Sequence, residues 1–248
     1  MSDAFETIAR DLMEGYVITS FAGTFEFMEL EFYLTTHDQT HHDPFTSCSK
    51  PQKKFGHWFL NKSGVDLTFG SPGYCASIMI RSVQDIETGQ LYMGPWRVFE
   101  LLFEDAGSAE KNELRTRIVP RTKSQKKGII SVPRVYPPVE RDSKDIDARI
   151  NFAFRPYRYV RTDIADYPEK YVAYLYLDKF LGKRPDIKED SKIYHKYVQF
   201  FDRGVLAESL EQIWNVSSRM HRMAMLMGYV YNQKKESTAI VSGRDAIN

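Results

Sequence analysis

The amino-acid sequence predicts an α+β fold in which a mostly antiparallel sheet is followed by helices. Segments rich in β-formers, separated by short turns, follow one another from residue 16 to residue 82, and such spacing favours antiparallel pairing. After residue 168 the apolar residues change to helical spacing. We therefore expect an α+β domain over residues 1–166 and a C-terminal helical extension over residues 167–248, packed on the same domain.

The N-terminal segment predicts a helix and then a β-hairpin. Ser2 can cap a helix whose apolar residues follow helical spacing, and Gly15 is placed to end it. The segments 16–21 and 24–34 are rich in β-formers and flank a turn. Alternation sorts the second strand into a core face, with Met28, Leu30, Phe32 and Leu34, and an opposite face, with Phe25, Phe27, Glu29, Glu31 and Tyr33.

The rest of the chain is predicted to complete the sheet and then to form helices. Residues 35–54 are polar and rich in turn formers, which predicts a long loop, and such loops are often functional. Pro95 opens an amphipathic helix. The expected strands are 56–60, 65–69, 76–82, 129–135 and 150–160. The expected C-terminal helices are 169–181, 191–201 and 206–231.

Composition favours a cytoplasmic protein in a reducing compartment. Only Cys48 and Cys75 could form a disulfide, and no apolar segment follows the first residues, so neither secretion nor a disulfide framework is expected. The longest apolar runs are far shorter than the roughly 20 residues that cross a bilayer, which excludes a membrane span. The oligomeric state is not determined, and a monomer is compatible with the sequence.

Net charge neither requires nor excludes a polyanionic partner, because 34 basic residues face 33 acidic ones. The distribution is more informative. Residues 115–127 contain six basic residues and no acidic residue. This run is either a solvated loop or a strip that faces phosphate groups, since clustered Lys and Arg attract nucleic acid irrespective of its sequence.

Glu31 and Tyr33 share one face of a strand, and His37, His41 and His42 follow in the next loop. A carboxylate on an aromatic, partly desolvated face has its pKa raised toward the range that activates water, and a neighbouring His can orient the substrate. The alternative interpretation is an exposed glutamate on a half-solvated strand, followed by loop histidines with no role.

A metal site is a second alternative for the same segment. His37 and His41 have a spacing that allows metal ligation if the loop is helical there, with His42, Cys48 or Glu31 as further ligands. No second pair at standard zinc spacing is present. We therefore expect neither a metal nor a cofactor.

Residues 31–42 resemble the active-site segment of the alkyladenine (3-methyladenine) DNA glycosylase family. The segment reads Glu-Phe-Tyr-Leu-Thr-Thr-His-Asp-Gln-Thr-His-His, and the family reads Glu-Ala-Tyr-Leu-Gly-Pro-x-Asp-x-Ala-x-His. Residues 78–81 resemble the family's Val-Leu-Leu-Arg strand, 94–95 its Gly-Pro helix start, and 155–160 its closing strand. The gapless matches in the first segment are Glu31, Tyr33, Leu34, Asp38 and His42.

This resemblance covers about the first 160 residues and implies a curved, mostly antiparallel sheet, a split barrel of the methylpurine DNA glycosylase type with flanking helices. It implies that Glu31 activates water against the glycosidic carbon, with Arg81 near the site. Tyr33 and His42 would sandwich the flipped purine, because stacking on flat side chains offsets part of the cost of leaving the duplex.

One departure from the family changes the expected pocket. Residues 65–70 replace the family's pair of tyrosines before a glycine. Asp66 stands where the stacking tyrosine is expected, so it would contact the base by hydrogen bonding, and Phe69 would serve as the apolar wedge. The helical tail matches nothing in the family.

The implied function is that of a monofunctional DNA glycosylase, which hydrolyses the N-glycosidic bond of a flipped modified base in duplex or single-stranded DNA. Two alternatives stay open: a nucleic-acid or nucleotide binding module with the same fold but no catalysis, and a metalloenzyme that uses the His-rich loop. The expected DNA contacts are Arg117, Arg121, Lys126, Lys127, Arg155 and Arg158.

Overall fold

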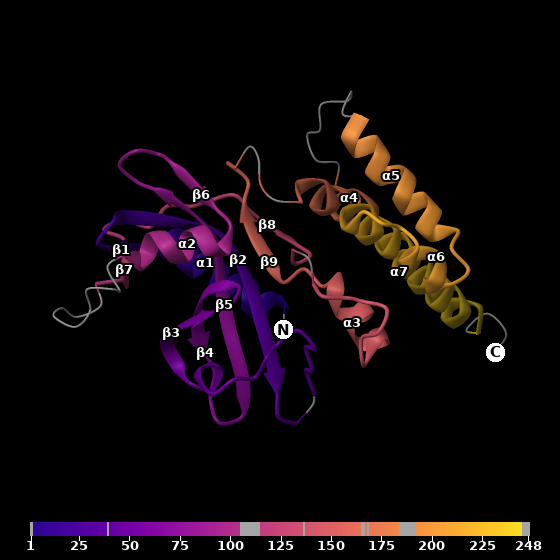
Figure 1. Cartoon of the computed structure of the whole chain (residues 1–248), viewed down its shortest axis with the longest axis horizontal. Helices are drawn as coiled ribbons and strands as arrows, with labels where there is room; N and C mark the ends of the chain where they lie inside the picture. Colours follow the sequence, from indigo (N-terminus) through magenta and orange to yellow (C-terminus); the bar gives the residue numbers. More distant parts are fainter. Residues whose placement is uncertain are drawn as a thin grey trace. The chain divides into compact units, whose positions relative to one another are not determined.

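Figure 1 shows the chain as a computed structural model. The structure describes residues 2–38, 40–104, 115–135, 137–164, 167, 169–183 and 192–244, with the backbone alone for residues 2 and 236–244. The chain divides into two compact units, Met1–Arg134 with Pro156–Pro168, and Val135–Arg155 with Glu169–Asn248. The domain boundary expected at residue 166 lies outside the described residues.

The first unit is α+β. Its helices are α1 (Ser2–Gly15), the short 3-10 helix η1 (Pro51–Lys53) and α2 (Pro95–Leu102). Its strands are β1 (Tyr16–Ser20), β2 (Gly23–Thr36), β3 (Phe55–Asn61), β4 (Gly64–Phe69), β5 (Tyr74–Asp85), β6 (Leu91–Met93), β7 (Arg117–Pro120), β8 (Ile129–Val132) and β9 (Arg158–Arg161). The expected first helix, hairpin and following strands are confirmed.

Within the described residues these nine strands form one antiparallel sheet that curls into a half-barrel. The main strand order is β3-β4-β5-β2-β1-β7, while β6 pairs with β5 and β9 joins β2 to β8. The long strand β2 is central, because β5 runs along one side of it and β1 and β9 share the other. Helix α1 packs on β2, and α2 packs on β4 and β5.

The apolar core lies on one side of β2. Phe5 of α1 stacks on Phe32 with ring centroids 4.7 Å apart, and Phe32 also contacts Tyr159 and Phe69 edge-on. Phe5, Ala9 and Met13 are buried at a spacing of four, so one stripe of α1 covers this core. Burial of this apolar area is the main force that holds α1 on the sheet.

The described elements of the second unit are all helices. Its helices are α3 (Ile146–Ala153), α4 (Lys170–Leu181), α5 (Lys192–Val205), α6 (Leu210–Trp214) and α7 (Arg219–Arg244). Helices α5 and α7 approach each other closely at two glycines. A Cβ atom on Gly204 would lie 1.8 Å from the carbonyl oxygen of Met225, and one on Gly228 would lie 2.0 Å from that of Phe201. Only glycine allows these two contacts.

Two sequence expectations were wrong here. Residues 150–160 were expected as one strand, but the structure ends α3 at Ala153 and begins β9 at Arg158. Ile150 and Ala153 face the core at helical spacing, and Pro156 disfavours helix at the residue before it, so the chain changes conformation at that point. The helix expected over residues 206–231 is divided into α6 and α7.

The structure also bears on the expected absence of a membrane span. Among the described helices, none combines the length and the apolar character that a bilayer crossing requires.

Candidate functional site

Strand register defines one polar face of the half-barrel sheet. Directly paired residues on antiparallel strands point to the same side. Register therefore aligns Asp66 (β4), Met79 (β5), Glu31 (β2) and Arg158 (β9) in one row. The neighbouring row contains Thr68, Ser77 and Tyr33. We call the side that carries these two rows the polar face.

Two glutamates of β2 are completely buried on this face. Glu29 and Glu31 are both 0% exposed. Arg81 of β5 donates from Nε to Glu29 Oε1 (3.0 Å) and from Nη1 to Glu31 Oε2 (3.4 Å), and Arg158 Nε donates to Glu29 Oε1 (2.7 Å). Ser82 Oγ donates to Glu29 Oε2 at 2.7 Å. The buried charges are thus paired and hydrogen-bonded, as burial of a carboxylate requires.

A β-bulge in β2 explains why simple alternation placed Phe25 and Phe27 on the wrong face. The pairing of β2 with β5 shifts between Phe27 and Glu29 and again between Glu29 and Leu30. Such shifts re-aim side chains. Phe25 and Phe27 are consequently buried in the core, although alternation placed them on the same face as the glutamates.

Tyr33 lies between Glu31 and a buried arginine. Its hydroxyl donates to Glu31 Oε2 at 2.8 Å, and the guanidinium carbon of Arg134 lies 4.7 Å from its ring centroid. Burial raises the pKa of Tyr33 well above its usual value, and the negative charge of Glu31 raises it further. Tyr33 therefore stays a neutral hydrogen-bond donor to Glu31.

Arg134 is itself held by an ion pair that the sequence did not reveal. It donates from Nη1 to Asp43 Oδ2 (2.6 Å) and from Nη2 to Asp43 Oδ1 (3.0 Å), and Asp43 is 1% exposed. Nη1 also donates to the carbonyl oxygen of Phe32 at 3.1 Å. A signal was present in the sequence, because Arg134 stands alone among Val132, Pro133 and Val135. A lone arginine in an apolar segment is buried only when it is paired.

Asp66 ends a hydrogen-bonded chain on the polar face. Its Oδ2 accepts from Ser77 Oγ (2.7 Å), its Oδ1 accepts from Asn61 Nδ2 (3.2 Å), and Ser77 Oγ accepts from Gln52 Nε2 (3.0 Å). Burial raises the pKa of Asp66 to about 6, although the bonds from Ser77 and Asn61 oppose the shift, and Glu31 adds to it. Asp66 therefore gains or loses its proton near neutral pH.

The three histidines of the long loop lie in different surroundings. His42 is exposed and forms an isolated bridge with Thr35, which places it on the polar face with Tyr33 and Glu31. His41 is 7% exposed and contacts the ring of Tyr157 at 5.8 Å. His37 lies beside Cys48 and Cys75. Of the metal ligands considered for this segment, the structure brings His37 and Cys48 together, whereas His41 and His42 lie in other surroundings.

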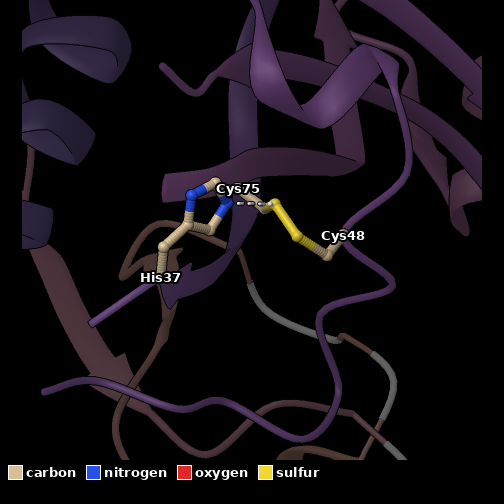
Figure 2. A group of neighbouring side chains, drawn as sticks. All are labelled: His37, Cys48 and Cys75. Atoms are coloured by element: carbon tan, nitrogen blue, oxygen red, sulfur yellow. Dashed lines mark hydrogen bonds between the residues drawn. A yellow bond between two sulfur atoms is a disulfide. The ribbon is translucent and has the colours of Figure 1, made fainter. Parts of the chain in front are cut away.

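Cys48 and Cys75 are joined by a disulfide, contrary to the expectation from composition (Figure 2). Their Cα atoms are 5.1 Å apart, within the range that a disulfide spans. The sequence left only this pair possible, but whether the two sulfur atoms meet depends on how the loop of residues 37–50 returns to β5. The sulfur of Cys75 lies 3.7 Å from His37 Nε2.

The expected DNA-contacting residues fall into different environments. Arg117 and Lys126 are exposed. Arg121 donates from Nη1 to Glu26 Oε1 at 2.7 Å, and Lys127 Nζ lies 3.5 Å from Glu26 Oε2, so both turn toward a carboxylate.

Glu26 forms ion pairs with Arg121, Lys127 and Arg161. Burial favours the protonated form, but hydrogen bonds from Arg161 and Arg121 prevail and lower the pKa of Glu26 to about 2. Two residues of the basic run, Arg121 and Lys127, therefore balance the charge of Glu26 within the chain.

Three other residues expected to contact DNA, Arg158, Phe69 and Arg155, lie beside protein partners. Arg158 is 1% exposed and paired with Glu29, so it is not on a surface that phosphate can reach. Phe69 is half-buried and contacts Phe32 edge-on at 6.1 Å, on the side of the sheet opposite to Glu31. Arg155 belongs to the second unit, where its guanidinium covers the ring of Phe152 at 3.8 Å.

Comparison with known proteins adds a distant similarity. No family model matches the chain. The chain is 27% identical over 136 residues to an uncharacterized protein of Acanthamoeba polyphaga mimivirus, an alignment that covers 45% of this chain and 62% of that protein. The chain therefore matches less than two thirds of the relative's length. The name of this relative, "Uncharacterized protein L759", gives no function.

Proposed function

We propose that the chain is a DNA N-glycosylase of the alkyladenine type, which hydrolyses the bond between a flipped modified base and its sugar without a metal. The observation that carries this proposal is the polar face, where register aligns Glu31, Tyr33 and His42 beside Asp66. Glu31, Tyr33 and His42 are the residue types, in the order, that the resembling family uses for catalysis and base stacking.

Two carboxyl groups in different environments suit hydrolysis of a glycosidic bond. Glu31 is ion-paired with Arg81, whereas burial raises the pKa of Asp66 to about 6. Carboxyl groups in different environments can divide the roles of base and acid. In this proposal Glu31 takes a proton from water as it attacks the sugar carbon, and Asp66 donates a proton to the departing base.

The spacing of the two strands is compatible with these roles. Glu31 and Asp66 lie in one row with β5 between them, so their backbones are about 10 Å apart, two inter-strand distances. Enzymes that invert a glycosidic centre separate their carboxyl groups by about 6.5–9.5 Å and place the attacking water between them. Arg81 would be the positioning residue that orients Glu31.

A second candidate is a nucleic-acid or nucleotide binding module with the same fold and no catalysis. Two observations favour it. Glu31 is 0% exposed, whereas a general base must reach water, and the guanidinium of Arg134 lies 4.7 Å from the centre of the Tyr33 ring. Catalysis would therefore require movement of the loop that carries Asp43, the partner of Arg134.

The test is base release by Glu31→Gln on a panel of duplexes that contain alkylated or etheno bases. Removal of a general base is expected to lower the rate by about 10²–10⁴-fold while duplex binding persists. Glu26→Gln is the matched control, because it removes a carboxylate from the same strand that is paired with Arg121 and Arg161 rather than with Arg81.

Two outcomes would contradict the enzyme. Glu31→Gln within a few fold of the wild-type rate would exclude Glu31 as the base. A wild-type chain that binds duplex but releases no base from any member of the panel would favour the binding module.

A further inference from the structure

His37, Cys48 and Cys75 place a nitrogen and two sulfur atoms together at one end of the polar face (Figure 2). Their ligand atoms all lie within 4.8 Å of one another, and His37 Nε2 is 3.7 Å from Cys75 Sγ. A sulfur and a nitrogen bound to one tetrahedral Zn²⁺, at about 2.3 and 2.05 Å, lie about 3.6 Å apart. The imidazole and the Cys75 sulfur already have the separation of two zinc ligands.

The backbone around His37 and Cys75 is fixed without the disulfide. Register pairs Thr35 with Cys75, and the amide of His37 donates to the carbonyl oxygen of Gly73 at 3.0 Å, which extends the β2–β5 ladder. Two of the three candidate ligands are therefore held by sheet hydrogen bonds. Reduction of the disulfide does not alter these bonds.

The loop that carries Cys48 is likewise anchored on both sides of it. Asp43 is held by the two hydrogen bonds from Arg134, and Gln52 donates to Ser77 Oγ at 3.0 Å. Ser49, next to Cys48, donates its amide to Gln52 Oε1 at 3.0 Å. These contacts keep Cys48 close to Cys75 once the two sulfur atoms are no longer bonded.

We propose that, with the disulfide reduced, Cys48, Cys75 and His37 bind Zn²⁺ as two thiolates and one imidazole, with water as the fourth ligand. A dithiol reductant transfers two electrons and two protons to the disulfide and leaves as its own disulfide, which yields two cysteine thiols. Zn²⁺ then displaces the two thiol protons. A peroxide or disulfide oxidant takes the two electrons back, and the ion leaves as the sulfur–sulfur bond forms.

The donor set selects the class of ion. Thiolates favour Zn²⁺ and other soft or borderline ions, whereas Mg²⁺ and Ca²⁺ prefer oxygen ligands. Three protein ligands with an open fourth position differ from the closed four-ligand sites that zinc uses for structure. The site is independent of the proposed glycosylase activity, because it uses neither Glu31 nor Asp66.

The experiment measures binding of Zn²⁺ alone to the full chain, once reduced with a phosphine and once oxidised. Competition with a chromophoric chelator gives stoichiometry and affinity, and Co²⁺ in place of Zn²⁺ reports thiolate ligation by its charge-transfer absorption. We expect one ion per reduced chain and none per oxidised chain. The oxidised sample also shows whether the chain binds Zn²⁺ at any other place.

Single substitutions assign the ligands. Loss of contacts that only support a metal ligand costs about 10–100-fold in affinity, so Cys48→Ser, Cys75→Ser and His37→Ala should each cost at least about 100-fold. His57→Ala is the control, an exposed histidine of β3 in the same unit, and it should leave the affinity unchanged. Circular dichroism of each variant separates loss of a ligand from loss of the fold.

Three results would overturn the proposal: no binding of Zn²⁺ by the reduced wild-type chain, equal binding by the oxidised and reduced chains, or wild-type affinity in folded Cys48→Ser. Base release by the same variants is measured in parallel, and it tests the other proposal separately.

Discussion

The two sides of β2 are stabilised by different forces. On one side Phe32 packs against Phe5 and Tyr159, and the energy comes from apolar area removed from water. On the polar face Glu31, Tyr33 and Arg134 form contacts that each need a particular partner.

The two sides of β2 therefore differ in the substitutions that they tolerate. Apolar packing tolerates substitutions of similar shape and volume, but a buried charge that loses its partner has no replacement. The polar face therefore specifies one arrangement, and such arrangements are what a binding or catalytic site requires.

The largest expected loss of stability follows from breaking the buried ion pair between Arg134 and Asp43. Arg134→Met leaves the Asp43 carboxylate buried without its two strongest donors, and we expect a loss of about 3–5 kcal/mol in the free energy of unfolding. The double variant Arg134→Met with Asp43→Asn should recover much of this loss, because no charge is then left unpaired. Urea unfolding of the single and double variants measures the coupling.

Phe32→Ala is the matched change on the apolar side. It should cost a similar 3–5 kcal/mol, about the usual cost of removing a buried phenylalanine, but no second polar substitution should restore it. If Arg134→Met cost less than about 1 kcal/mol, the pair would lie in a solvated environment and the contrast between the two sides would fail.

An intermediate effect is expected in the pH dependence of stability. The folded pKa of Asp66 is raised from 3.8 to about 6, so its contribution to stability is present below pH 4 and is lost as pH rises toward 6. This loss amounts to at most about 3 kcal/mol. Asp66→Asn should remove it and flatten the unfolding free energy between pH 4 and 6.

Glu26 provides the opposite sign in the same fold. Its folded pKa is lowered from 4.5 to about 2, so its contribution is present above pH 4.5 and is lost as pH falls toward 2. Glu26→Gln should flatten that acidic limb and leave the pH 4–6 region unchanged. Identical profiles for the two variants would show that neither carboxyl group titrates as its environment indicates.

The smallest effect on stability is expected at the exposed part of the basic run. Arg117→Ser and Lys126→Ser should change the free energy of unfolding by no more than about 0.5 kcal/mol, as most surface substitutions do. If both residues contact phosphate, the double variant should reduce the salt slope of duplex binding by about 1.8.

Arg121→Ser is the comparison for these exposed residues. It removes a partner of Glu26 and should therefore lower stability as well as binding. A salt slope that stays unchanged in the Arg117 and Lys126 double variant would identify this run as solvated surface and would argue against DNA as the ligand.

Elements that depend on neighbouring residues could be predicted from the amino-acid sequence. Helix α1, the β1–β2 hairpin, β3 to β5 and the start of α2 at Pro95 follow from periodicity and turn chemistry, which act over a few positions. The pairing of Tyr33 with Glu31 is also local, because residues two apart on a strand share a face. The segment 150–160 was misjudged because its apolar residues suit a strand and a buried helix equally.

The identity of the buried polar groups and of their partners depends on contacts between residues that are far apart in the sequence. Arg134 and Asp43 are 91 residues apart, Arg81 and Glu29 are 52 apart, and Cys48 and Cys75 are 27 apart. No local pattern encodes these partners. A charged group enters the interior only where the folded chain supplies its counter-charge, and that depends on strand register, on the bulge in β2 and on the return of the long loop to β5.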